Sequence, residues 1–139
     1  MTGIIKNMFV KPGPGQAMKA SGELEMVAGK GIQGDNAFGR KRRQVLLVDQ
    51  AILDAFGLDP GDLRENLTVS GLDLQIIAPG SLLEAGASTL MVQGECTPCS
   101  KMDEIKPGLQ ASLQARRGLL ASVVEGGTIR IGDTIALRV

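Results

Sequence analysis

The stretch 119-LLASVVEGGTIRIGDTIALRV-139 decides which kind of fold the sequence encodes. Three short apolar segments, residues 119–124, 128–131 and 134–139, are separated by a Gly-Gly and a Gly-Asp turn. In the last segment Ile135, Leu137 and Val139 alternate with Thr, Ala and Arg, as in a strand with one buried face. The pattern predicts three strands that form a β-meander.

Short apolar segments separated by glycine-containing turns also occur through the rest of the sequence, and the whole chain contains nineteen glycines. Further strands or extended segments are expected at residues 3–10, 16–28, 44–48 and 67–69 and, as short strands between turns, within 73–93. Residues 11–15 and 29–43 are expected to be loops. A short helix is expected after Asp49, a good N-cap, and a second one near Leu109 and Leu113. Many short strands with a few short helices predict one mainly β domain over residues 1–139, built as a closed or nearly closed β-barrel.

Composition excludes several classes of partner. Apolar residues make up 43% of the 139, but only three residues are aromatic, so the core must be aliphatic. The fifteen basic and fifteen acidic residues balance, so no overall field attracts nucleic acid or a membrane. Single-stranded nucleic acid would also need aromatic stacking platforms. We therefore expect neither nucleic acid nor a membrane as a partner.

The beginning of the chain, MTGIIKNMFV, lacks the pattern of a secretory signal peptide. No apolar run approaches the roughly 18 residues of a membrane-spanning helix. The expected location is therefore the cytoplasm, where cysteines are usually reduced thiols.

Both cysteines lie in 94-GECTPCSKM-102. A structural zinc site needs four nitrogen or sulfur ligands, and a chain with no histidine and no second cysteine pair cannot complete one alone. A redox dithiol, a reactive thiol and a purely structural role stay open. Polar, turn-like surroundings favour an accessible thiol, and Lys101 would favour its thiolate form.

Two basic stretches are candidates for anion recognition. Residues 40–43 are Arg, Lys, Arg and Arg within a Gly-rich loop, and Arg116 and Arg117 add a second contact. Guanidinium groups suit phosphate, although an exposed charge cluster is the more ordinary explanation of such a run. GKGIQGD does not have the spacing of a nucleotide-binding phosphate loop. In 64-RENL-67 three hydrogen-bonding side chains precede a strand.

Several stretches together resemble one family, the MOSC domain, named for the C-terminal domain of molybdenum cofactor sulfurase. They are GIQGD (31–35), RRQVLLVD (42–49), GDLRENLTVSGLDL (61–74), PGSLLEAGASTLMV (79–92), CTPC (96–99), RRGLLASVVEGG (116–127) and IRIGD (129–133). Their order is similar to that of the stand-alone, single-domain members. The resemblance implies a β-rich barrel.

The resemblance also implies a site. The invariant cysteine of the family corresponds to Cys99, which would carry a persulfide or bind molybdenum as a thiolate, with Cys96 as an auxiliary thiol. Arg43, Arg64, Asn66 and Arg116 occupy motif positions that would line the same cleft, with Lys101 nearby. The implied cofactor is of the molybdopterin type, whose phosphate the arginines would bind.

The sequence departs from the family in two respects. Many relatives have a histidine shortly after GIQGD, whereas Asn36, Ala37 and Phe38 follow here. The N-terminal pyridoxal-phosphate domain of the larger sulfurases has no counterpart, so this chain is not expected to bind pyridoxal phosphate. A separate cysteine desulfurase or molybdenum-cofactor protein is the expected partner.

Four functions follow as hypotheses. The first is a molybdenum-cofactor-binding or sulfur-carrier domain, with a sulfurtransferase-like activity. The second is a small molybdenum-dependent reductase of N-hydroxylated compounds that receives electrons from partner proteins. The third is a redox protein that uses the dithiol Cys96–Cys99. The fourth is a non-catalytic binding module.

Overall fold

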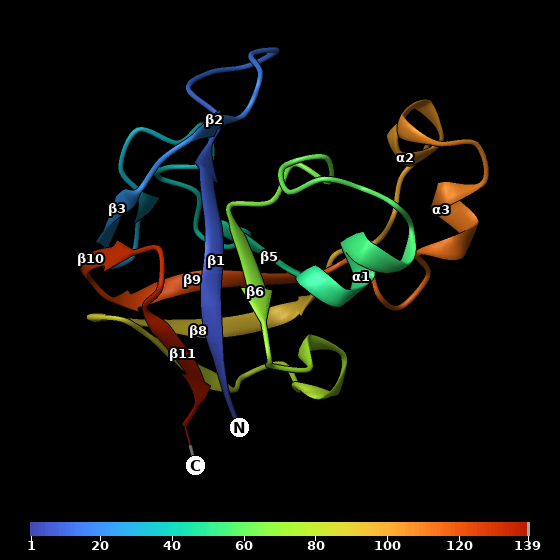
Figure 1. The fold of residues 1–139 in the computed structure, drawn as a ribbon. Coiled ribbons are helices and arrows are strands. Elements are labelled where there is room, and N and C mark those ends of the chain that lie inside the picture. Colours follow the sequence, from blue (N-terminus) through green and yellow to red (C-terminus); the bar gives the residue numbers. More distant parts are fainter. Residues whose placement is uncertain (139) are drawn as a thin grey trace.

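The computed structural model describes residues 1–138 and consists mainly of short strands (Figure 1). The strands are β1 (Thr2–Val10), β2 (Lys19–Ala20), β3 (Glu23–Val27), β4 (Gly31–Ile32), β5 (Val45–Asp49), β6 (Leu67–Ser70), β7 (Leu82–Ala85), β8 (Ser88–Glu95), β9 (Leu119–Glu125), β10 (Gly127–Arg130) and β11 (Thr134–Leu137). The helices are α1 (Gln50–Ala55), α2 (Lys101–Ile105), α3 (Leu109–Ser112) and a single 3-10 turn, η1 (Leu74–Ile76).

Seven strands close into a barrel in the order β11-β7-β8-β9-β5-β6-β1, and β1 pairs back onto β11. Among the strands of residues 1–138, only β5 and β6 pair in parallel, because α1 and the loop after it return the chain before β6 begins. β2 extends β1, and β10, β3 and β4 form a separate three-stranded sheet. The predicted mainly β, closed barrel with a few short helices is confirmed.

The C-terminal strands form, but the predicted meander is wrong. β9 pairs with β8 and β5, β10 pairs with β3, and β11 pairs with β1 and β7. Each barrel strand has only two edges, and the barrel closes by giving both edges of β11 to β1 and β7. No edge of β11 is then left for β10. Val139 of the predicted last strand lies outside the described residues.

Two other segments differ in detail from the prediction. The extended segment 16–28 is divided into β2 and β3, because the Ser21 N–H donates to the carbonyl of Met8 and draws the chain toward β1. The loop 29–43 contains the two-residue strand β4, which pairs with β3. The helix after Asp49 is confirmed: the Asp49 carboxylate accepts a hydrogen bond from the N–H of Ala51.

The core has two parts, and both are aliphatic as the composition predicted. The first fills the barrel; its largest fully buried members include Ile5, Met8, Leu47, Leu67, Leu83 and Leu90. The second lies against the outside of the barrel beneath the helices; its members are Val48, Ile52, Leu53, Leu63, Met102, Leu109 and Leu113. Figure 1 shows α1, α2 and α3 grouped on one side of the barrel. The helices thus form a single apolar cover for that side.

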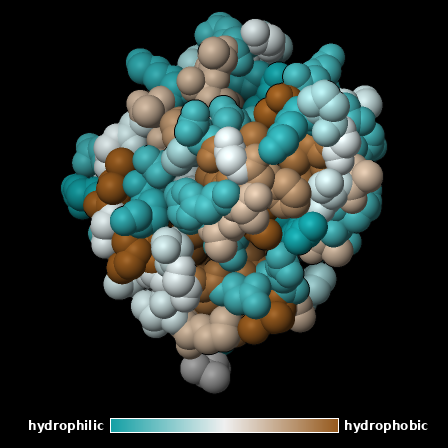
Figure 2. Space-filling view, turned by 45° about the vertical axis from the view of Figure 1, so that its right-hand side comes forward, coloured by the Kyte–Doolittle hydropathy of each residue, from teal (hydrophilic) through white to brown (hydrophobic). Residues whose placement is uncertain are grey.

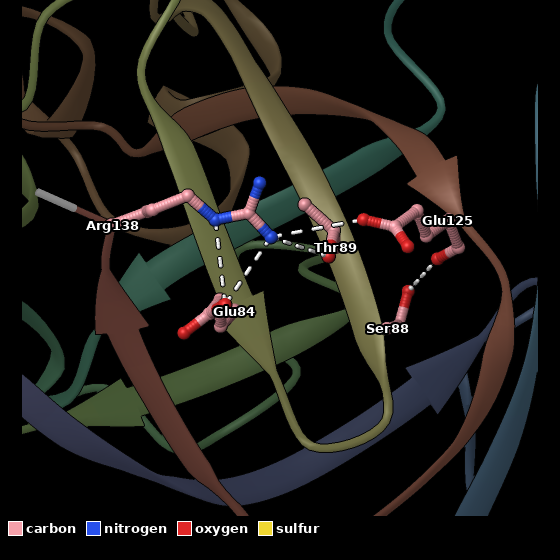
Figure 3. A network of polar contacts seen from close by, with 5 residues as sticks. All are labelled: Glu84, Ser88, Thr89, Glu125 and Arg138. Carbon is pink, nitrogen blue, oxygen red and sulfur yellow. Dashed lines mark hydrogen bonds and ion pairs between the residues drawn. The ribbon is translucent and has the colours of Figure 1, made fainter.

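A polar clasp lies over the strands next to the barrel seam (Figure 3). The Arg138 guanidinium lies 3.2 Å from a carboxylate oxygen of Glu84 and 3.7 Å from one of Glu125, and it also donates to the Thr89 hydroxyl. The Ser88 hydroxyl donates to the backbone carbonyl of Glu125. The clasp joins the end of β11 to β7, β8 and β9 on the exposed side.

Apolar residues on the face shown in Figure 2 lie in separate groups between hydrophilic ones. Within residues 1–138, no helix has both the length and the apolar character needed to cross a membrane.

Candidate functional site

A cleft of about 250 Å³, called here the basic cleft, lies beside the start of β5 and β6. Its walls come from the Gly-rich loop before β5, the loop before β6 and the end of β8. Four of its lining residues are cationic: Lys11, Arg40, Arg43 and Arg64. The only acidic lining residue is Asp35. The cleft therefore presents an excess of positive charge, which suits an anionic ligand.

Arg43 and Arg64 share an unusual backbone conformation. Their φ angles are 57° and 60°, in the left-handed region that side chains other than glycine rarely adopt. Such positions cost roughly 1–3 kcal/mol and are concentrated at functional sites. Both side chains are exposed, and the ion pairs found in residues 1–138 are made by Arg130 and Arg138, so neither Arg43 nor Arg64 is paired with a carboxylate. Both predicted arginines lie in the basic cleft.

Asn66 lies in the same cleft, but its polar atoms are occupied by the protein. The side-chain amide donates to the carbonyl of Phe9 at 3.1 Å and to Asp35 Oδ1 at 3.2 Å. Its oxygen accepts a hydrogen bond from the N–H of Leu46 at 2.9 Å. The amide therefore joins β1, β5 and the GIQGD loop, and it shapes the wall of the cleft.

Asp35 is the counterpart of Asn66 in that wall. Besides the bond from Asn66, its Oδ1 accepts from the N–H of Lys11 at 2.9 Å, and its Oδ2 accepts from the N–H of Ala37 at 3.0 Å. Asp35 was not predicted as a site residue. The sequence signal that could have identified it is an acidic residue in a glycine-containing loop, GIQGD. In the structure its carboxylate holds that loop in place.

The two cysteines differ in position. Cys96 is half-buried and lines the basic cleft. Cys99 is exposed and lies three positions further along the chain, just before α2. The Cys96 N–H donates to the carbonyl of Gly118 at 2.8 Å, which continues the pairing of β8 with β9. Both thiols are free. Lys101 is exposed on α2, outside the lining of the basic cleft.

Arg116 and Arg117 point in different directions. Arg116 is exposed; its Nε donates to the carbonyl of Ser112 at 2.9 Å, and its guanidinium lies 5.1 Å from the ring centre of Phe56. The structure thus places Arg116 against the helical cover and outside the lining of the basic cleft. Arg117 is only 6% exposed, and its Nη2 donates to the carbonyl of Leu63.

Glu65 is a further buried charged residue near the cleft, besides Asp35 and Arg117. It is fully buried, and its Oε2 accepts hydrogen bonds from the N–H of Gly61 at 3.0 Å and from the Thr68 hydroxyl at 2.9 Å. Within residues 1–138, its Oε1 and Nη1 of Arg117 have no hydrogen-bond partner. Neither residue was predicted as catalytic or cofactor-binding, because burial of a charge between distant segments leaves no local pattern.

The basic cleft is the middle part of a longer groove. A neighbouring hollow of about 400 Å³ shares Arg43 and Leu120 with it, and there Arg42 donates to the side chain of Gln93 at 2.9 Å. A hollow of about 500 Å³ on the other side shares Lys11, Met18 and Arg64. A ligand larger than the central cleft therefore has room to extend in both directions.

The donor groups decide which kind of cofactor fits. Within residues 1–138, no cluster of three or more His, Cys, Asp or Glu side chains is arranged to hold a metal ion. One thiol and several guanidinium groups line the groove instead. This set fits a phosphate-bearing cofactor that brings its own metal ligands and takes one soft thiolate from the protein.

Comparisons with known proteins agree with this fold. The sequence profile of the MOSC domain matches residues 34–136. No curated protein sequence matches the chain significantly.

Solved structures similar to this chain cover nearly all of it. The YuaD protein from Bacillus subtilis is 25% identical with a TM-score of 0.82, and the match covers 97% of this chain and 94% of that one. YiiM from Escherichia coli is 19% identical with a TM-score of 0.74, covering 100% and 70%. YiiM from Geobacillus stearothermophilus is 17% identical with a TM-score of 0.76, covering 100% and 76%. The two YiiM structures support the fold alone.

Proposed function

Because the chain belongs to the MOSC domain family, which is associated with the molybdenum cofactor, we propose that it binds a molybdopterin-type cofactor or carries sulfur for one. The observation that supports this most is the composition of the basic cleft. Two unpaired arginines on strained backbone, Arg43 and Arg64, face the same space as the thiol of Cys96. A phosphate and a sulfur-bound centre are the two groups such a cleft would hold.

Each residue of the candidate site, inside or outside the cleft lining, has a defined task in this proposal. Arg43 and Arg64 bind the cofactor phosphate through paired N–H donors, and Asn66 keeps the wall between them in place. Cys99, the family position, supplies the thiolate, and Cys96 presents a second thiol to the cleft. Lys101 and Arg116 are exposed cations outside the lining of the cleft, and they add positive charge only through the reach of their side chains. When bound, the cofactor supplies a molybdenum centre that takes up sulfur or exchanges electrons.

The sulfur-carrier function requires a donor, for which we propose a separate cysteine desulfurase that bears a persulfide. The cysteine thiolate of this chain attacks the outer sulfur of that persulfide. A new S–S bond forms, the old one breaks, and the thiolate of the donor leaves with the electron pair. The exposed position of Cys99 makes this thiol accessible to a protein partner.

The experiment that tests this function is the intact mass of protein purified without reductant, with metal and pterin analysis of the same sample. We expect a gain of about one sulfur atom, or bound molybdenum with pterin, in the wild-type protein. Cys99→Ser should remove it, and Arg43→Ala with Arg64→Ala should remove bound cofactor. Full retention of sulfur and cofactor in Cys99→Ser and also in Cys96→Ser would refute the proposal.

A redox dithiol is the second candidate, because two free thiols lie three positions apart on one exposed loop. The same mass measurement separates the two functions. Loss of about two hydrogens, without sulfur or metal, identifies a reversible disulfide between Cys96 and Cys99. In that case both cysteines should be equally necessary, whereas a sulfur carrier should depend mainly on one.

A further inference from the structure

Within residues 1–138, two buried charged residues next to the basic cleft each have one polar atom without a partner. Glu65 is fully buried and Arg117 nearly so, yet each keeps one polar atom without a hydrogen bond in the described part of the chain. The two residues are also not joined by an ion pair there. Leaving a charged atom buried and unpaired costs free energy, so a native structure that keeps two of them needs a reason.

Arg117 connects two segments: the backbone beside it contacts the cysteine loop (residues 96–99), and its side chain contacts the loop before β6. The residue after Arg117, Gly118, accepts the hydrogen bond from the N–H of Cys96. Its guanidinium donates to the carbonyl of Leu63, directly before the cleft residue Arg64. Burial lowers the pKa of the Arg117 guanidinium, and negative charge at Cys96, Glu65 and Cys99 opposes this change. These hydrogen bonds place Arg117 between the segment that carries Cys96 and the loop that carries Arg64.

We propose that the buried Arg117 and the cleft residue Cys96 form a subsite for an anionic sulfur group. Nη1 of Arg117, which has no partner within residues 1–138, is the donor that binds the anion. The identity of that anion, a persulfide or a cofactor sulfur, rests on the function proposed above. Glu65 balances the buried guanidinium while the subsite is empty. Arg117 is thus a binding residue that selects negative charge at the sulfur of Cys96.

Comparison with other polar residues supports this role. Asn66 serves the architecture, and all of its side-chain groups are hydrogen-bonded within the protein. A purely architectural arginine would be expected to be satisfied in the same way. Arg117 instead uses one nitrogen to anchor itself to Leu63 and keeps another free. Its neighbour Arg116 is turned toward Phe56 and lies outside this arrangement.

The test compares two alkylating reagents of equal reach and different charge. In a Cys99→Ser background Cys96 is the only thiol, and its rates with iodoacetate and with iodoacetamide are measured at one pH and low salt. The ratio of the two rates is independent of the thiolate fraction, so it reports the local charge alone. Arg117→Gln should lower the iodoacetate-to-iodoacetamide ratio by about five-fold, as loss of one nearby charge implies. Arg117→Lys should retain most of it.

Further variants make the result specific. Glu65→Gln should raise the ratio, because it removes a buried negative charge. If Glu65→Gln and Arg117→Gln merely loosened the fold, they would not change the ratio in opposite directions. Arg130→Gln, which removes a cation paired with Glu23 in the separate sheet, controls for net charge. Thermal melting checks that each variant is folded; if Arg117→Gln does not fold, Arg117→Lys and Glu65→Gln still decide.

Two results would overturn the inference. The first is an equal ratio in Arg117→Gln and Arg130→Gln, or, where Arg117→Gln does not fold, no rise in Glu65→Gln. The second is a decrease caused by Arg116→Gln and not by Arg117→Gln. Neither result depends on cofactor or sulfur loading, so failure of the subsite is distinguishable from failure of the proposed function. If the wild-type protein carries neither sulfur nor molybdenum but the variants show the predicted alkylation ratios, the proposed function is refuted and the subsite is not.

Discussion

At the scale of single residues, Arg43 and Arg64 of the basic cleft are unusual in their backbone conformation. Both occupy left-handed conformations for which glycine is the better residue. Elsewhere in residues 1–138, apart from Ala115, glycines take this conformation, for example Gly34 and Gly57. An arginine kept at such a position contributes its guanidinium at a cost in stability, which is the trade expected at a binding site.

The first prediction compares two replacements of Arg64. Arg64→Gly and Arg64→Ala both remove the guanidinium, but only glycine also relieves the backbone strain. Arg64→Gly should be more stable than Arg64→Ala by about 1 kcal/mol in the free energy of unfolding, measured with urea. Both variants should lose affinity for inorganic phosphate equally in calorimetric titration. Equal stability of the two variants, or phosphate binding that survives in either, would contradict this reading of Arg64.

At the scale of elements, the short helix α1 links the parallel strands β5 and β6 and brings a titratable cap with it. Asp49 ends β5 and caps α1, and partial burial raises the pKa of its carboxyl. The hydrogen bond from the N–H of Ala51 opposes this increase, and the nearby charge of Asp73 adds to it. Because the raised pKa means that folding favours the protonated form, the charged cap opposes folding at neutral pH.

The second prediction follows from the direction of the pKa shift of Asp49. The stability contributed by Asp49 is present below its unfolded pKa of 3.8 and is lost as the pH rises through its higher folded pKa. Asp49→Asn keeps a capping oxygen without the charge, so it should exceed the wild type in unfolding midpoint at pH 7. The difference should shrink as the pH falls toward 3.8.

Thermal unfolding of both proteins between pH 3 and pH 8 measures this difference. Glu104→Gln, at an exposed acid on α2, controls for the loss of one negative charge. A difference between Asp49→Asn and the wild type that stays constant with pH would show that the carboxyl of Asp49 is not responsible.

At the scale of the whole molecule, barrel closure depends on close contact at one seam. Gly3 of β1 pairs with Ile135 of β11, where the two ends of the chain meet. A Cβ at Gly3 would lie 2.5 Å from the carbonyl oxygen of Ser70 and 2.9 Å from Cβ of Leu72. The first strand thus fits between β11 and β6 only with a hydrogen at this position.

The third prediction tests this seam. Gly3→Ala should lower the free energy of unfolding by about 1–3 kcal/mol, the usual range for an overpacked site. Gly22→Ala is the matched control, because no atom lies within 4 Å of a Cβ there and its backbone is not left-handed. Urea denaturation of both variants measures the effect, and two indistinguishable curves would exclude a tight seam at Gly3.

Of the residues named from the sequence motifs, Cys96 and three others line one cleft, whereas Cys99, Lys101 and Arg116 do not line it. Arg43, Arg64 and Asn66 lie where a common cleft was expected, since family motifs preserve the order of residues around a site. Arg117 was named as a possible second anion contact but was not placed in this cleft, and Glu65 was not assigned to it. Their importance comes from burial between β6, the cysteine loop and the segment before β9, and no spacing in the sequence reports such a contact.

The sequence by itself determined the mainly β class, the aliphatic core and the short helices, because alternation, glycine turns and caps are local properties of the chain. Only the tertiary structure decided that β11 pairs with β1 and β7 instead of with β10. It also decided that adjacent Arg116 and Arg117 face Phe56 and Leu63 respectively. Strand partners and buried charges depend on residues far apart in the chain, and closure and burial select among them only when the whole barrel forms.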